Sequence, residues 1–215
     1  AHARQERESV RRAKEDVASI TGELRGTLTV GIISSVPLLD IVDLIGTFHA
    51  RFPKVDIQLL HNPSERLIEG VRERRIDFAI IGVPRRVALQ GLQKRLILSE
   101  DLVAILPAGH ALAKRDGLRL EELVDLPMVD LPAGSGARRQ TDEAFTALGL
   151  PHRVRSETTN MQLLERFVRR GLAVGLVPRS IVDSFNGIAS VPVSDAPSRN
   201  VFAIWSNSPT PATLA

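Results

Sequence analysis

Three short segments of the sequence carry the residue types best suited to bind a ligand. They are Ser34-Ser35, the segment around Ser64, and the glycine-rich segment Ala133-Gly134-Ser135-Gly136. Each is expected to lie where a strand ends and a helix begins, so that hydroxyl groups and free backbone N–H groups meet at the positive end of a helix dipole. That combination binds carboxylates and phosphates. Each serine taken alone is better explained as a helix cap, but three such segments together favour an anion-binding site.

Catalytic and metal-binding patterns are not found in the sequence. The five histidines are scattered, cysteine is absent, and no nucleophile elbow of the G-x-S-x-G type occurs. The glycine-rich segment is no dinucleotide fingerprint, because Arg139 stands where the third glycine is required, and no Gly-Lys-Ser/Thr follows it. We therefore predict no catalytic residues, no metal and no cofactor, which favours a binding protein over an enzyme.

The composition is that of an ordinary globular protein. Of 215 residues, 43% are hydrophobic and 25% charged, with a net charge of +3. No apolar run approaches the ~18 residues of a membrane helix, and basic and acidic residues are interspersed, which argues against nucleic-acid binding by this chain alone. The sequence begins without Met and without an apolar leader. We expect a fragment of a longer cytoplasmic protein with no membrane contact.

Hydrophobic periodicity divides the chain into an amphipathic start and two α/β halves. In residues 1–25, apolar residues recur at heptad spacing from Val10 to Leu24. This pattern predicts a helix that pairs with another helix or joins two domains, although a solvated terminal helix is the alternative. Strands are expected at 28–32, 55–59 and 78–81, with a core helix at 38–48 and a second helix from 64 to 71. This β-α-β-α-β order predicts a parallel sheet.

The second half repeats the pattern. The expected strands are 102–106, 128–129, 173–177 and 201–205, with Val154 on a further strand, and the expected helices are 120–124, 137–148 and 161–168. Two similar halves indicate two lobes with a cleft between them. The chain would cross between the lobes near 99–101 and 194–200.

Five stretches, in this order and spacing, resemble the effector-binding part of LysR-type transcriptional regulators. They are Leu24-Arg25-Gly26-Thr27-Leu28-Thr29-Val30-Gly31, Phe48-His49-Ala50-Arg51-Phe52-Pro53, Arg75-Ile76-Asp77-Phe78-Ala79-Ile80, Leu106-Pro107-Ala108-Gly109-His110-Ala111-Leu112 and Arg169-Arg170-Gly171-Leu172-Ala173-Val174-Gly175-Leu176-Val177-Pro178. The resemblance covers nearly all of residues 1–205.

The resemblance implies an α/β fold with two Rossmann-like lobes of the type 2 periplasmic-binding-protein fold, preceded by a linker helix. Residues 1–25 would be the linker and dimerisation helix, 26–101 plus 200–215 lobe I, and 102–199 lobe II. It also implies a small anionic metabolite as effector, a homodimer or homotetramer, and operator DNA bound only through a winged helix-turn-helix that this sequence lacks. The last family helix would be missing after Asn207.

The family binds its effector between the lobes. Matching this sequence to the family's pocket positions gives a candidate site of ten residues. These are Ser34, Ser35, Ser64, Gly82, Val83, Ser135, Gly136, Ala137, Asn160 and Met161. Some family members place an arginine near the position of Gly82. Here the cation that meets the effector is left open among Arg85, Arg86, Arg138 and Arg139.

Two other functions compete with a transcriptional regulator. A solute-binding protein of a transporter would have the same fold, but it would need a secretion signal and no heptad helix. An enzyme on a related two-lobe fold is disfavoured because no acid, base or nucleophile converges. The full-length reading frame would separate the first two, through an upstream helix-turn-helix or a signal peptide.

Overall fold

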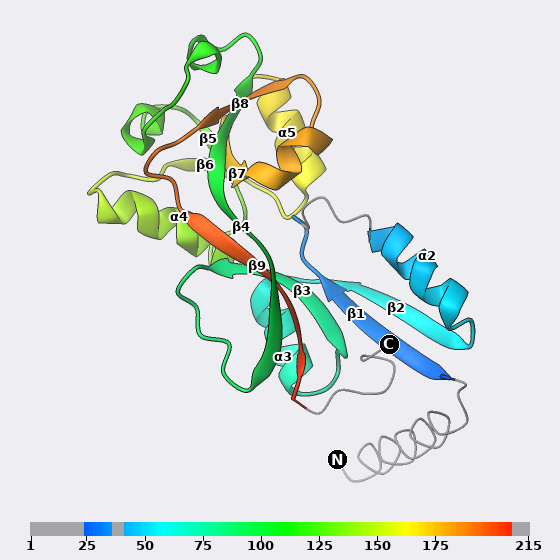
Figure 1. Ribbon diagram of the computed structural model, residues 1–215. Coiled ribbons are helices and arrows are strands. Elements are labelled where there is room, and N and C mark those ends of the chain that lie inside the picture. Colours follow the sequence, from blue (N-terminus) through cyan, green and yellow to red (C-terminus); the bar gives the residue numbers. More distant parts are fainter. Residues whose placement is uncertain (1–23, 36–40, 208–215) are drawn as a thin grey trace.

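The computed structural model describes residues 24–35 and 41–207, which form two α/β lobes joined by a pair of long antiparallel strands (Figure 1). Seven strands form one sheet, six of them in the order β2-β1-β3-β9-β4-β7, and the seventh, β8, pairs with β4 off this path. Strands β5 and β6 form a separate two-stranded sheet.

The first lobe is built on the predicted parallel sheet. Strand β1 (Gly26–Ile32) pairs in parallel with β2 (Val55–His61) on one side and β3 (Phe78–Pro84) on the other. Helix α3 (Ser64–Arg72) covers one face, and it packs so closely on β1 that a Cβ on Gly31 would lie 2.5 Å from Leu67 Cδ2. Glycine at position 31 is therefore needed for this contact.

Strands β4 (Leu92–Pro107) and β9 (Ser198–Ser206) connect the lobes. They pair antiparallel from Leu92↔Ser206 to Asp101↔Ser198, with a register shift between Leu96 and Leu98. Strand β9 also completes the first lobe by pairing antiparallel with β3. The predicted crossovers near 99–101 and 194–200 thus lie side by side as one ribbon.

The second lobe surrounds the later half of β4. Strands β7 (Gly175–Pro178) and β8 (Ile188–Pro192) pair antiparallel with β4, and β5 (Met128–Asp130) pairs in parallel with β6 (Val154–Glu157). The helices are α4 (Gly136–Ala147), α5 (Met161–Arg169) and the 3₁₀ segments η1 (Ala111–Lys114), η2 (Leu120–Leu123) and η3 (Arg179–Ser184).

Each lobe has its own hydrophobic core. In the first lobe, Leu67, Val71 and Ile81 are buried with residues of β3 and β9. In the second, one cluster centres on Phe145 and η2, and another packs α5 against β4. The two lobes therefore do not share one continuous hydrophobic core.

The helix expected at 38–48 differs from the prediction in its packing. Its described part, α2 (Ile41–Arg51), has no buried residue, and Leu44 on it is 51% exposed. Phe48 alone among its residues packs against the small cluster of Leu28, Val30 and Val55. The apolar spacing was interpreted as a core helix, which is wrong for this chain: α2 leaves most of its apolar side uncovered.

The other predicted elements are present with shifted ends. Strand β8 and the first half of β4 were not predicted, because neither shows a clear alternating pattern. Residues 1–23, Leu38, Leu39 and 208–215 lie outside the described residues, and with them most of the predicted linker helix and the C-terminal end.

Candidate ligand-binding site

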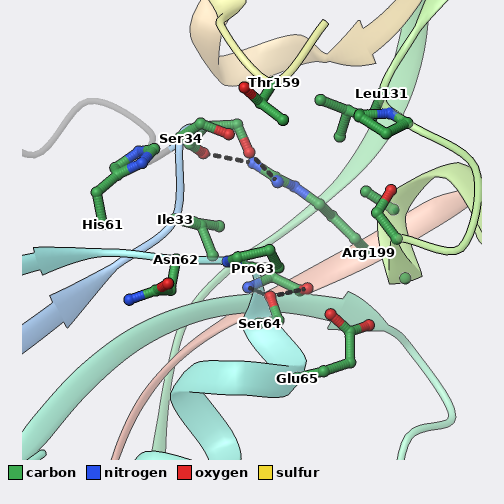
Figure 2. Close-up of a pocket in the computed structure, with 16 residues that line it drawn as sticks. Ile33, Ser34, His61, Asn62, Pro63, Ser64, Glu65, Leu131, Thr159 and Arg199 are labelled. Carbon is green, nitrogen blue, oxygen red and sulfur yellow. Dashed lines mark hydrogen bonds between the residues drawn. The ribbon is translucent and has the colours of Figure 1, made fainter. Parts of the chain in front are cut away.

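A cavity of about 320 Å³ lies between the lobes (Figure 2). Its lining comes from the ends of β1, β2 and β3, from the starts of α3 and α4, and from β9. The lining residues are Ile33, Ser34, Ser35, His61, Asn62, Pro63, Ser64, Glu65, Gly82, Leu131, Pro132, Ser135, Gly136, Ala137, Thr159 and Arg199. This position, past the carboxyl ends of parallel strands, is where open α/β sheets bind ligands.

Ser64 fastens the start of α3 to the end of β3. Its hydroxyl donates to the Gly82 carbonyl oxygen at 2.8 Å and accepts from the Gly82 N–H at 3.1 Å. No side chain caps the N-terminus of α3. Ser64 is therefore not a helix cap, and its hydroxyl is not a free hydrogen-bond donor. Its hydroxyl holds the cavity wall in place.

Arg199 is the cation of the cavity. From β9 it donates through Nη1 to Ser35 Oγ at 2.7 Å and through Nη2 to the Ser35 carbonyl oxygen at 2.9 Å. Its Nε donates to Glu100 Oε1 at 2.9 Å. Burial lowers the pKa of the Arg199 guanidinium, and the charge of Glu100 opposes that effect. Arg199 thus ties the end of β1 to the ribbon between the lobes.

The second lobe contributes the start of α4. Ser135 caps this helix, because its side chain accepts from the Arg138 N–H at 3.3 Å. Gly134 before it has φ of +85°, a conformation that favours glycine. The predicted helix-opening loop is therefore confirmed as a local structure, and its free N–H end faces the cavity through Gly136 and Ala137.

Several polar groups in the cavity wall have unused hydrogen-bonding capacity. In the described part of the chain, the side chains of Ser34, His61, Asn62 and Thr159 form no hydrogen bond, and the Ser35 hydroxyl accepts from Arg199 but donates to nothing. Figure 2 shows Ser34, His61, Asn62 and Thr159 arranged around the cavity. A polar small molecule could satisfy these groups.

Seven of the ten candidate residues line this cavity, and three do not. Val83 is buried in the core of the first lobe, since it points away from Gly82 along an alternating strand. Asn160 caps α5 by accepting from the Leu163 N–H at 3.0 Å. Met161, the first residue of α5, is buried in the core of the second lobe and lines a smaller, adjoining cavity that Ser35 and Arg199 also reach.

None of the four arginines left open by the sequence lines the cavity. Arg85 forms an exposed ion pair with Asp101 at 3.2 Å. Arg139 lies 3.7 Å from Glu65 Oε1, with 62% of its side chain exposed. Arg138 is used inside the second lobe, and Arg86 has no part in the cavity wall.

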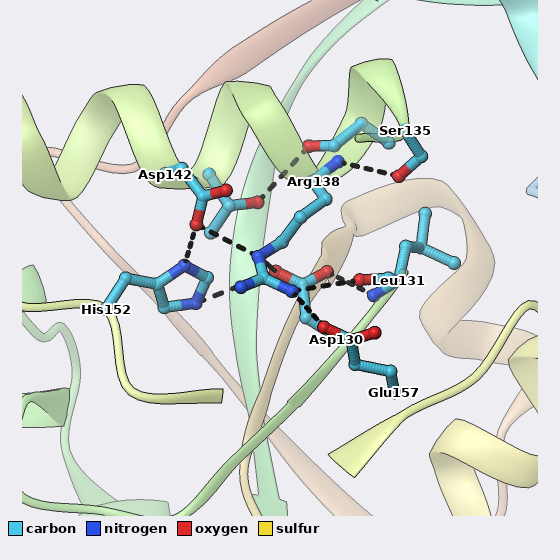
Figure 3. Close-up of polar contacts among 9 residues, drawn as sticks. Asp130, Leu131, Ser135, Arg138, Asp142, His152 and Glu157 are labelled. Atoms are coloured by element: carbon cyan, nitrogen blue, oxygen red, sulfur yellow. Dashed lines mark hydrogen bonds and ion pairs between the residues drawn. The ribbon is translucent and has the colours of Figure 1, made fainter. Parts of the chain in front are cut away.

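Arg138, on α4, belongs to a polar cluster in which its own side chain, Asp130 and His152 are largely buried (Figure 3). It donates to Asp142 at 2.9 Å, Glu157 at 3.0 Å and the Leu131 carbonyl oxygen at 3.2 Å. His152 Nδ1 lies 2.6 Å from Asp142 Oδ1. Its Nε2 faces Asp130 Oδ2 at 3.6 Å, and both atoms are buried without a hydrogen-bond partner among the described residues.

Burial sets the protonation of this cluster. It raises the pKa of Asp130 to about 7, against the opposing effects of the Leu131 N–H and Arg138. It also lowers the pKa of His152, although Asp142 favours the charged imidazole. The Oδ2 atom of a neutral Asp130 faces His152 Nε2 at 3.6 Å, so one proton between these two atoms would reduce the cost of burying both.

Within residues 24–35 and 41–207, no three metal-ligating side chains come together. No helix in those ranges is long and apolar enough to cross a membrane. Sequence reasoning missed His61, Asn62, Glu65, Thr159 and Arg199. Asn62 and Glu65 flank Ser64, so the same strand end could have indicated them. Arg199 lies in a segment that was interpreted only as a crossover.

Residues 21–215 match the LysR substrate binding domain family. Among curated proteins, the chain is similar to the transcriptional dual regulator GltC of Bacillus subtilis, with 26% identity over 179 residues. That match covers 83% of this chain and 59% of GltC, so the chain spans little more than half of that relative.

Solved structures show the same fold. The CcmR regulatory domain of Synechocystis PCC6803 in complex with 2-PG aligns with a TM-score of 0.77 and 19% identity, over 88% of this chain and 93% of that one. The effector binding domain of QuiR in complex with shikimate aligns with a TM-score of 0.72 and 15% identity, over 88% and 92%. The predicted two-lobe fold and the resemblance are confirmed, and the chain belongs to the LysR substrate-binding domain family.

Proposed function

We propose that this chain is the effector-binding domain of a LysR-type transcriptional regulator and that a small carboxylate-bearing metabolite binds between its lobes. The observation that carries the proposal is the inter-lobe cavity of about 320 Å³, whose wall offers unpaired hydroxyl, amide and imidazole groups beside a buried arginine. The complexes of QuiR with shikimate and CcmR with 2-PG support a small metabolite as the class of ligand.

The same proposal assigns roles to the parts of the chain. Residues 26–101 with 200–215 form lobe I, 102–199 form lobe II, and 1–25 form a linker that joins a DNA-binding domain to them. Operator DNA is bound through that other domain, in the cytoplasm, and the chain itself catalyses no reaction. The curated relatives support this assignment, because they are transcriptional regulators.

Binding would act by changing the populations of two arrangements of the lobes. A ligand shifts such an equilibrium only through its different affinity for the two states. Here the cavity is lined from both lobes and from β9, so a ligand that contacts all three favours one relative position of the lobes.

We expect Ser35→Ala to weaken effector binding by about 1–3 kcal/mol, because a ligand oxygen would lose its hydroxyl partner and Arg199 would lose an acceptor. The measurement starts with a thermal-shift screen of organic acids, amino acids and aromatic metabolites. A ligand at 100 times its dissociation constant adds about 2.7 kcal/mol of stability. Hits are then titrated by calorimetry against the wild type and the variant.

Ser64→Ala serves as a comparison within the same wall. Its hydroxyl is used by Gly82, so its loss should lower the free energy of unfolding by about 1–3 kcal/mol. If Ser35→Ala binds a confirmed hit as tightly as the wild type does, the ligand binds somewhere other than at Ser35. A hit that is chemically converted on incubation would instead favour the alternative that this protein is an enzyme.

The uncovered apolar side of α2 supports a homodimer. Leu44 of α2 and Leu59 and Leu60 of the edge strand β2 are 51%, 44% and 37% exposed. We expect Leu44→Glu to shift the chain toward monomer in sedimentation or light scattering, since a buried charge would oppose packing of two copies. If the wild type is a dimer and Leu44→Glu has the same mass in solution, α2 is not part of the dimer interface.

A further inference from the structure

We propose that the effector carries an ammonium group as well as a carboxylate, and that Glu65 binds the ammonium group. This inference rests on the proposed function and narrows it to one class of metabolite, the zwitterionic amino compounds. It comes from the charges in the cavity wall, which do not match a ligand with negative charge alone.

Among the described residues that line the cavity, Glu65 is the only one with an acidic side chain. It follows Ser64 at the start of α3, in lobe I, and its carboxylate reaches across to lobe II. A Cβ built on Gly136 would overlap Glu65 Oε1, so the carboxylate rests against the backbone at the start of α4. It therefore lies at the cavity, where a ligand would meet it.

The charge of Glu65 is compensated by the start of α4, which its carboxylate contacts, and by one exposed ion pair. Its one ion-pair partner in the described chain is Arg139, at 3.7 Å from Oε1. Both side chains are more than half exposed, and exposed pairs of this kind contribute little. The carboxylate forms no hydrogen bond within the described residues. It can accept a charged donor from a ligand without breaking a strong interaction.

The positive charge in the cavity wall is also compensated. Arg199 Nη2 lies 2.8 Å from Glu100 Oε1, and Glu100 is itself only 9% exposed. What Arg199 and Ser35 can still offer is hydrogen-bond donation, which suits one carboxylate. Figure 2 shows the Arg199 guanidinium and Glu65 at separate places on the wall. A second negative group on the ligand would meet Glu65, and the nearest cation there, Arg139, is exposed and does not line the cavity.

A zwitterion fits this distribution. Its carboxylate would accept from the Ser35 hydroxyl and Arg199, and its ammonium group would donate to Glu65. Charge-assisted hydrogen bonds are roughly twice as strong as neutral ones, so the ammonium group should contribute strongly to affinity. Removing it leaves the Glu65 carboxylate beside an uncharged ligand group.

The test compares matched ligands on matched variants. The probes are the twenty protein amino acids, ornithine and 4-aminobutyrate, each paired with the carboxylic acid that lacks the amino group, such as glutamate with glutarate. Thermal shift finds the hits, and calorimetry gives the dissociation constants for the wild type, Glu65→Gln and Glu69→Gln. Glu69 lies on the same helix, is exposed and does not line the cavity, so its variant controls for the change in net charge.

In the wild type and in Glu69→Gln, an amino compound should bind at least about tenfold more tightly than its partner acid. In Glu65→Gln this preference should fall below about threefold. The proposal is wrong if no amino compound binds, if the acids bind as tightly as the amino compounds, or if the preference survives in Glu65→Gln. Acids that bind in a Ser35-dependent manner would then still support the sensor, whereas the absence of any Ser35-dependent ligand would contradict the proposed function itself.

Discussion

Glu100→Ala should lower the free energy of unfolding by about 3–5 kcal/mol, the largest loss that we expect from a single substitution in this chain. The variant leaves Arg199, which is 6% exposed, as a buried charge without its counter-ion. It also removes the acceptors of the Ser180 N–H at 2.7 Å and the Ser180 hydroxyl at 3.0 Å. Urea unfolding followed by the fluorescence of Trp205, the only tryptophan, measures the change.

The next residue provides the control. Asp101 pairs with Arg85 at the surface, with 65% and 51% of the two side chains exposed, so Asp101→Ala should cost at most about 1 kcal/mol. The double variant Glu100→Met with Arg199→Met should recover part of the loss, because no unpaired charge then remains. If Glu100→Ala cost no more than Asp101→Ala, the pair would not stabilise the ribbon between the lobes.

The Glu100–Arg199 pair also connects stability to the proposed function. Glu100 holds the start of η3 in the second lobe through Ser180, and Arg199 holds the end of β1 in the first lobe through Ser35. A ligand that binds Ser35 therefore contacts a chain of polar interactions that reaches both lobes.

Asp130→Asn should gain stability relative to the wild type as the pH rises from 5 to 8, by about 1–3 kcal/mol in total. The pKa of Asp130 is raised to about 7 in the folded protein, so the folded state keeps a proton that the unfolded state releases above about pH 4. The contribution of Asp130 to the free energy of unfolding of the wild type therefore falls as the pH rises toward 7. Asparagine mimics the neutral acid at every pH, because its amide can face His152 while its oxygen keeps the Leu131 N–H.

His152 contributes with the opposite sign, which is why the comparison between variants is more informative than the wild-type profile. Burial lowers its pKa, so its contribution is lost as the pH falls below about 6.5, where the unfolded imidazole takes up a proton first. The difference between Asp130→Asn and wild type removes the part of that effect that does not depend on Asp130. Urea unfolding at pH 5, 6, 7 and 8 measures it.

Asp183→Asn is the control, since Asp183 is an exposed aspartate on η3. It makes the same exchange of a carboxyl for an amide at a site away from the cluster of Asp130 and His152. A flat difference for Asp130→Asn would mean that Asp130 is ionised throughout this range. The buried atoms Asp130 Oδ2 and His152 Nε2 would then have to be satisfied by other means.

Local pattern was sufficient for much of the fold. The alternating residues of β1 and β2, the apolar strand β3 and the helical spacing of α3 and α5 all fall where the sequence predicts them. The same holds for the loop of Gly134 and Ser135, because a left-handed glycine and a capping serine are local requirements. Lobe boundaries, the linker and the ligand contacts stay predictions.

Local pattern failed where a residue's environment comes from distant parts of the chain. The spacing of α2 indicated an apolar side, but whether that side is covered depends on what packs on it, and the structure leaves Leu44 exposed. Ser64 was interpreted as a cap or a free donor, although Gly82, 18 residues away, uses its hydroxyl. Arg138 was a candidate for the ligand, and it is instead buried among Asp142 and Glu157.

The sequence by itself determined the class of fold and the strand ends that supply Ser35, Ser64 and Ser135, because periodicity and turn chemistry act between near neighbours. The family came from the five stretches that resemble LysR-type regulators. Only the tertiary structure decided the charges of the site. Arg199 reaches Ser35 over 164 residues, since β9 returns antiparallel to β3 and β4 and sets Arg199 opposite Glu100. Glu65 reaches Gly136 only because the two lobes face each other. Such pairings depend on how strands from both halves align, and no local pattern records that.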